Sequence, residues 1–136
     1  MEHTLAPGTL AAPMHEHVHE DEYTIVLEGR VDALLGDELV HASEGEVLAK
    51  PRGQRHTFWN AGDSPARVHE IICPAGFEGF FFDLADTLDE RPRLRELRQL
   101  CRRYDVKMHF ETVPGLLETY GLTQAPAHDL DLIRGV

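Results

Sequence analysis

Short β-rich runs closed by glycine, aspartate or proline most strongly limit the folds open to this chain. Turn-forming glycines recur at Gly29, Gly36, Gly45, Gly53 and Gly62. The runs beside these turns predict strands over residues 22–27, 30–35, 38–41, 47–49, 54–59 and 66–73. Strands at a spacing of roughly 8 to 10 residues are typical of an antiparallel sandwich or barrel. About seven or eight strands, enough to close a jelly roll, are expected before the C-terminal half of the chain.

The apolar pattern becomes helical after Pro74. Apolar residues there recur about every 3.6 positions instead of alternating. One helix is predicted through Phe80, Phe81, Leu84 and Leu88. A second helix, opened by Pro92, is predicted through Leu94, Leu97, Leu100, Cys101 and Tyr104.

These patterns give an all-β fold class, a jelly-roll barrel over residues 1–76 with C-terminal α-helices of the same domain over 77–125. The helices are expected to cover one outer face of the barrel. A late strand is predicted over 106–110 and a short helix over 115–120, followed by a loose tail over 126–136.

The excess of acidic residues limits the classes of molecule that this chain is expected to bind. The 136 residues carry 13 Lys and Arg against 24 Asp and Glu, a formal net charge of −11. No basic stripe is present to meet a phosphate backbone or an anionic membrane surface. Two cysteines are too few for a disulfide framework, the start lacks the pattern of a secretion signal, and no apolar run approaches the ~20 residues of a membrane span. We expect a cytoplasmic protein that binds a small molecule rather than nucleic acid or membrane.

Histidines that alternate with other residues stand near the start of the chain, at His15, His17 and His19. In a strand these three side chains share one face, whereas Glu22 has the opposite parity. A turn over 18–21 would bring Glu22 back to His15 and His17. One later histidine, His56, is placed to join them from a distant strand. Imidazole nitrogens and a carboxylate oxygen together suit a divalent transition metal.

These residues and their spacing resemble the two motifs of the cupin superfamily, as found in small conserved-barrel, quercetinase-like members. The first motif is matched by His15, His17, Glu22 and Gly29. The second is matched by Gly45, Pro51, Gly53, His56 and Asn60. Two motifs in the correct order form a specific signal, covering about residues 8–74.

The resemblance implies that His15, His17, Glu22 and His56 hold one divalent transition metal per chain. The ligand set suits iron, manganese, nickel, copper, cobalt or zinc. The resemblance also implies a homodimer. Pro7, Gly8 and Pro13 predict a short extended segment and a turn over residues 1–14, a brief lead-in or an edge strand. Similar small cupins carry one or two more strands at the start, so the first strand is expected to be missing or supplied by a partner subunit.

Two alternatives to this ligand set follow from the same residues. His19 could pair with His17 in place of His15, but only two residues would then separate it from Glu22, fewer than the family pattern requires. We therefore expect His19 at the rim of the site. Without a metal, the run would be a solvated histidine-rich loop and His56 an ordinary buried histidine, an interpretation that the second motif weakens.

Further candidates line the expected pocket. Phe58 and Asn60 share the strand parity of His56, and alternation along 66–73 turns either His69 or Glu70 inward. Such a group, or Glu22 itself, is a candidate general base. The aromatic run over 77–82 is expected to pack in the core, with a pocket seal or a dimer contact as alternatives.

The sequence supports three functional hypotheses. The first is a metal-dependent dioxygenase, an oxidoreductase that acts on a small enolic or phenolic compound. The second is a cupin that binds a metal and a small molecule without catalysis. The third is a metal-dependent isomerase or cyclase that consumes no dioxygen. Because one fold can host all three, the site must decide between them.

Overall fold

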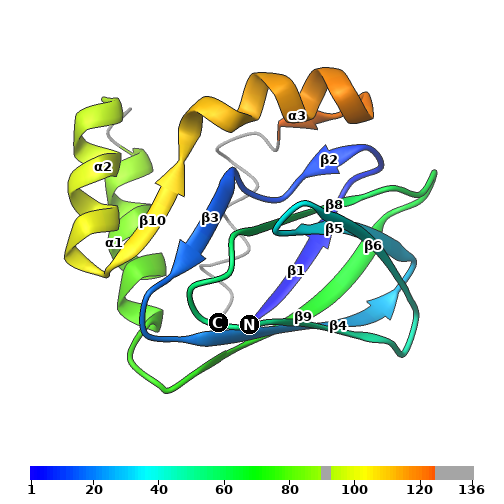
Figure 1. Cartoon of the computed structure of the whole chain (residues 1–136), viewed down its shortest axis with the longest axis horizontal. Helices are drawn as coiled ribbons and strands as arrows, with labels where there is room; N and C mark the ends of the chain where they lie inside the picture. The colour runs from blue at the N-terminus through cyan, green and yellow to red at the C-terminus, as the bar shows by residue number, and fades with distance from the viewer. Residues whose placement is uncertain (90–92, 125–136) are drawn as a thin grey trace.

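Alternating apolar residues place one face of each strand in a shared core, and two facing sheets result. In the computed structural model, which describes residues 1–89 and 93–124, these sheets form a jelly-roll barrel (Figure 1). One sheet has the order β1 (Glu2–Leu5), β9 (Ala66–Cys73), β4 (Asp21–Glu28) and β7 (Val47–Lys50). The predicted all-β fold class with C-terminal helices is confirmed.

The second sheet is built around β8. It contains β10 (Val106–His109), β3 (Met14–His17), β8 (His56–Asn60), β2 (Thr9–Leu10) and β11 (Thr123–Gln124). On the other side of β8 lies β5 (Arg30–Leu35), which pairs in turn with β6 (Glu38–Ser43). Every pairing in both sheets is antiparallel except that of β11 with β2 in the described part of the chain.

The core between the sheets consists of small and branched apolar side chains. Its buried members are Leu5, Val26, Val31, Ala33, Ala42, Leu48, Phe58, Ala66 and Val68. The turn into β5 depends on Gly29, whose backbone has a φ of +79° and lies against the strand start at Ala66. An added Cβ there would meet the Ala66 Cα at 3.1 Å, so a larger residue would displace β9.

The lead-in contributes two strands of its own to the barrel. β1 pairs with β9 along its whole length, and β2 pairs with β8 through Leu10 and Trp59. β1 lies at the edge of its sheet, as in the edge-strand alternative for this segment.

The C-terminal segment forms α1 (Glu78–Asp89), α2 (Leu94–Arg103), the 3₁₀ turn η1 (Phe110–Thr112) and α3 (Val113–Tyr120). Helices α1 and α2 lie side by side at one end of the barrel, and α3 crosses another face above β2 (Figure 1). α3 starts two residues before the predicted 115–120 because Pro114 occupies its first turn.

This segment also enters the sheet, through the predicted late strand and through β11, which was not predicted. β10 pairs antiparallel with β3, and β11 pairs parallel with β2. The predicted strand 106–110 ends at His109 because Phe110 begins the 3₁₀ turn. Pro92, expected to open the second helix, and the tail predicted over 126–136 lie outside the described residues. Within 1–89 and 93–124, no helix is long and apolar enough to cross a membrane.

Candidate metal centre

Strand register brings four predicted side chains together from three strands. His15 and His17 lie on β3, Glu22 near the start of β4, and His56 at the start of β8. The chain turns between β3 and β4, at the place where the parity argument required a turn. His15 stands directly across from His56 in the β3–β8 pairing. Backbone pairing therefore aligns His15 with His56, whereas Glu22 reaches them from the facing sheet.

The second-motif loop is fastened to the first-motif strand by its glycine. The Gly53 N–H donates a hydrogen bond to the His17 carbonyl at 2.8 Å, and Gly53 has a φ of +76°. This left-handed conformation is costly for residues with a Cβ. Gly53 therefore links the two motifs in space.

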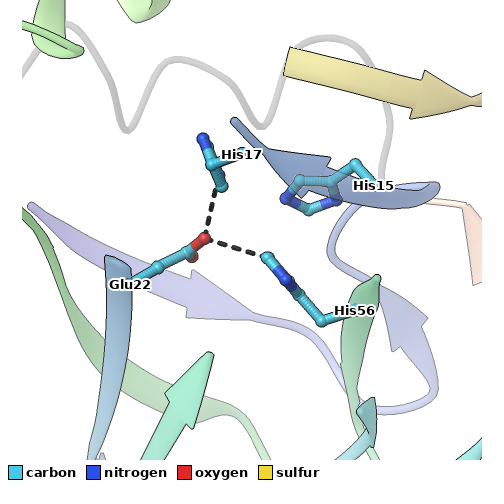
Figure 2. A group of neighbouring side chains, drawn as sticks. All are labelled: His15, His17, Glu22 and His56. Atoms are coloured by element: carbon cyan, nitrogen blue, oxygen red, sulfur yellow. Dashed lines mark hydrogen bonds and ion pairs between the residues drawn. The ribbon is translucent and has the colours of Figure 1, made fainter. Parts of the chain in front are cut away.

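The four side chains form a buried cluster with one donor atom each within 4.8 Å of the others. Figure 2 shows His17 and His56 pointing at the Glu22 carboxylate, with His15 beside them. The Glu22 Oε2 atom lies 3.0 Å from His17 Nε2 and 3.0 Å from His56 Nε2. Such a convergent set of nitrogens and one oxygen matches the donors that first-row transition metals prefer.

Backbone carbonyls fix which ring nitrogens can bind a metal. Nδ1 of His15 lies 2.8 Å from the Pro13 carbonyl, and Nδ1 of His56 lies 3.1 Å from the Gln54 carbonyl. A carbonyl only accepts hydrogen bonds, so both Nδ1 atoms carry the proton and both Nε2 atoms present lone pairs. Nε2 of His56 faces the Glu22 carboxylate at 3.0 Å, so a nitrogen donor and an oxygen donor are directed at one point. The residues present fit a metal.

His17 carries a second sign of the same kind. Its Nδ1 is buried without a hydrogen-bond partner, as is Oε2 of Glu20, and these two atoms lie 3.8 Å apart. Binding of a metal through Nε2 would place the ring proton on Nδ1, on the side of Glu20. Glu20 is thus an outer partner of the centre that the motif reasoning missed.

A fully buried lysine holds the other oxygen of Glu22. Lys50 Nζ donates to Glu22 Oε1 at 2.7 Å and to Glu70 Oε2 at 3.2 Å, while the Thr24 hydroxyl donates to Glu70 Oε1 at 2.7 Å. Lys50 faces Glu22 directly across the β4–β7 pair. The lysine therefore holds Oε1, and Oε2 is the oxygen of Glu22 that faces the histidines.

Charge and burial act in opposite directions on this network. Burial opposes ionisation of Glu22, but the Lys50 ammonium and the neighbouring hydrogen bonds hold its pKa well below the ordinary value. Burial, with the nearby Glu22 charge, raises the pKa of Glu70 to about 8. Burial, with the adjacent His56 ring, lowers the pKa of His15 to about 3, so its imidazole is neutral, the form that binds metals.

The other predicted residues have different placements. Phe58 and Glu70 line the same cavity as His15, His17 and Glu22, and it is Glu70, not His69, that β9 turns inward. Asn60 does not face this cavity as expected. Its amide donates to the Leu5 and Ser64 carbonyls, and its oxygen accepts from Gly62 N–H, so the buried amide closes the turn after β8.

His19 lies outside the cluster. Its ring is exposed and contacts Asp105 at 3.0 Å across the surface. This placement agrees with the rim position expected from the spacing to Glu22.

Lys50 was missed because the strand was expected to end one residue earlier. The signal that could have found it is parity, since Leu48 and Lys50 alternate with exposed residues and both are buried. Phe77 was expected in the core, and its ring also lies against the His17 ring at 4.5 Å between centroids. No local sequence pattern predicts the contact between the Phe77 and His17 rings.

Comparison with known proteins places this geometry in a family. Residues 1–72 match the family model of the cupin domain. Over 70 residues the chain is 39% identical to the tetracenomycin polyketide synthase protein TcmJ of Streptomyces glaucescens, covering 52% of this chain and 46% of that protein. Over 69 residues it is 33% identical to the oxidoreductase iacF of Pestalotiopsis fici, covering 50% of this chain and 32% of that protein. The chain spans less than half the length of these two curated relatives.

Solved structures agree on the fold. The protein TT1209 from Thermus thermophilus superposes with a TM-score of 0.51 at 29% identity, covering 54% of this chain and 69% of that one. A cupin protein from Bacteroides fragilis superposes with a TM-score of 0.51 at 23% identity, covering 55% of this chain and 64% of that one, a likeness of fold alone. With the family model matched over more than half of its residues, the chain belongs to the cupin family.

Proposed function

We propose that this cupin is a mononuclear metal-dependent enzyme, an oxidoreductase of the dioxygenase type that acts on an enolic or phenolic compound. The observation that carries the proposal is the convergence of His15, His17, Glu22 and His56 on one buried point that opens into a cavity. These four side chains would hold the ion. When bound, a divalent transition metal supplies Lewis-acid chemistry and, if redox-active, electron transfer at the oxygen atoms of the substrate.

The chain's own residues orient the donors before any ion arrives. Pro13 and Gln54 carbonyls fix the His15 and His56 rings, and Lys50 fixes one oxygen of Glu22. Outer partners of this kind typically change metal affinity by ~10–100-fold when removed. The centre is therefore preorganised.

Glu70 is the carboxylate that we propose for proton transfer. Among the residues that the structure describes, Glu22 and Glu70 are the two carboxylates that line the cavity, and Glu22 is committed to the ligand set. In its ionised form, Glu70 would accept a proton from a substrate hydroxyl, and its raised pKa of about 8 makes that form the main one only at mildly alkaline pH.

Two relatives support chemistry of this class by their names. One is called an oxidoreductase and the other a polyketide synthase protein. The second name also favours metal-assisted cyclisation of a polyketide without dioxygen as a second candidate. A homodimer in the cytoplasm remains a prediction from the sequence.

Metal analysis of the protein purified without a histidine tag or added metal tests the centre. We expect about one transition-metal ion per chain. In His56→Ala or Glu22→Ala, metal affinity should fall by more than the ~10–100-fold that is typical when an outer partner is removed. His19→Ala is the matched control, because His19 lies on the same segment but outside the cluster. Unchanged metal content in His56→Ala would remove the assignment.

Oxygen uptake then separates the candidate reactions. Substrate-dependent consumption of dioxygen by the metal-loaded protein supports the dioxygenase. Conversion of the substrate without oxygen uptake supports a cyclase or isomerase, and binding without conversion supports a non-catalytic cupin.

A further inference from the structure

The metal centre is one end of a larger cavity that reaches the C-terminal helices. A single cavity of about 540 Å³ is lined at one end by His15, His17 and Glu22 and elsewhere by side chains of α1, α2 and β10. The helical contribution includes Phe80, Leu84, Leu88, Leu97 and Leu100. We call this helical part the apolar chamber.

An aromatic wall connects the metal centre to the apolar chamber. The His17 ring meets Phe77 edge to face at 4.5 Å, and Phe77 stacks on Phe80 at 5.0 Å. Phe81 then packs against both phenylalanines at 5.6 and 5.5 Å. A molecule that binds at the ligand end would continue along aromatic rings.

The carboxylates and histidines that line the cavity all come from strands of the barrel. His3, Glu22 and Glu70 lie at the barrel end, with the ligand histidines. From α1, α2 and β10, within 1–89 and 93–124, no charged side chain lines the cavity, although both helices carry many charges on other faces. A ligand that matches this cavity has an oxygen-bearing head and an apolar body.

The volume of the cavity suits a ligand larger than a few carbon atoms. Pockets for drug-sized molecules measure about 300–1,000 Å³, and this cavity lies within that range. A ligand of a few carbons would leave the remainder to water against apolar walls, which is unfavourable. Leu84 and Leu97 line the chamber yet are only half-buried, so a ligand body would cover apolar surface that the protein alone does not.

From this arrangement we propose that the ligand is an extended amphipathic molecule, with adjacent enol, phenol or carbonyl oxygens at the metal end and an aromatic or other apolar body in the apolar chamber. The oxygen-bearing head rests on the proposed function, whereas the apolar body rests on the chamber alone. The C-terminal helices, which lie beyond the residues matched by the family model, would therefore select the substrate.

A pair of probes that share one chelating head tests the chamber. Maltol and 3-hydroxyflavone both present a 3-hydroxy-4-pyranone, but only the flavone adds a large aromatic body. With the full chain loaded with zinc(II), we expect 3-hydroxyflavone to bind at least tenfold more tightly than maltol, measured by flavone fluorescence and by calorimetry. After removal of zinc with a chelator, maltol binding should disappear while weaker flavone binding remains.

The outcomes of this experiment separate the two proposals. Equal affinities for the two probes in the zinc form would overturn the chamber, and so would failure of the flavone to bind in either form. Flavone binding without any zinc-dependent maltol binding would support the chamber while contradicting the metal-dependent function.

Matched substitutions locate the bound body. Leu97→Gln places an amide in the chamber and should weaken flavone binding about tenfold while leaving maltol binding unchanged. Leu94→Gln is the control, because Leu94 is on the same helix, is 48% exposed and does not line the cavity. Leu84→Gln on α1 repeats the test, and thermal melting verifies that each variant folds. Flavone affinity unchanged in folded Leu97→Gln and Leu84→Gln would overturn the proposal, and the probe comparison on the unaltered protein decides if both unfold.

Discussion

Different kinds of interaction position the side chains at the two ends of the cavity. At the metal end, directional bonds position every side chain: strand register, carbonyl contacts to imidazoles and the Lys50 bridge between two carboxylates. At the helical end, Phe80, Leu100 and the other apolar side chains pack without hydrogen bonds, and the directional contact beside them is that of the Tyr104 hydroxyl, which donates to Asp83 of α1. The difference teaches that one end is built for precise placement of atoms, and the other for fit to a shape.

The sharpest way to break this comparison is to remove the charge at the centre of the metal end. In Lys50→Met, two buried carboxylates lose their shared cation, and we expect the free energy of unfolding of the metal-free protein to fall by ~3–5 kcal/mol. Denaturant titration measures this loss. Adding Glu70→Gln to Lys50→Met should recover part of it, since only one buried carboxylate then remains. A stable Lys50→Met protein would mean that the metal end does not depend on this bridge.

Phe77 stands at the junction of the two ends and tests whether they are separable. It is buried against both His17 and Phe80, so Phe77→Ala should lower the free energy of unfolding by about 3 kcal/mol through the cavity it leaves. Zinc affinity, measured by competition with a chromophoric chelator, should change less than tenfold because no ligand is lost. Phe82→Ala is the control, because Phe82 is 54% exposed. A large loss of zinc affinity in Phe77→Ala would show that the ends are coupled.

At neutral pH the smallest expected effect belongs to His3, a polar side chain of the cavity wall that affects stability only as the pH falls. Burial, together with the positive amino terminus, lowers the pKa of His3 to about 4 from 6.5. Between those values the unfolded chain binds a proton that the folded chain does not, so stability falls as the pH drops from 6.5 toward 4, by at most about 1.4 kcal/mol per pH unit.

In His3→Gln this part of the pH dependence should be absent. Denaturation at several pH values, compared between the metal-free wild type and the variant, measures the difference. NMR titration of His3 gives its pKa directly, and a value near the ordinary 6.5 would contradict the burial of this ring at the polar end of the cavity.

The candidate ligands at the metal end were largely predictable, because local spacing indicates three of them and the resemblance to the two cupin motifs implies the full set. His15, His17 and Glu22 lie within one turn and two strands, and His56 follows a recognisable loop. Lys50 was not predictable in the same way, since a lysine before proline resembles a surface charge. That Lys50 pairs with Glu22 follows only from the register of β4 and β7.

The helical end was predictable as helices but not as a cavity wall. The spacing of Leu84, Leu88, Leu97 and Leu100 indicates amphipathic helices, and the structure confirms α1 and α2. The surface that those apolar faces cover depends on the tertiary structure and cannot be derived from the local pattern. The return of β10 to β3 and the parallel pairing of β11 with β2 join distant segments, and no local pattern encodes them.

The position of β10 has a consequence for the order of assembly. β3, the strand that carries His15 and His17, hydrogen-bonds on one side to β8 and on the other to β10, which the ribosome produces only after both helices. Until then β3 has an open edge, and open edges are sites of mispairing between chains. Nascent or truncated chains that stop before Val106 should therefore be the species that chaperones must protect, even though all four candidate ligands have already been synthesised.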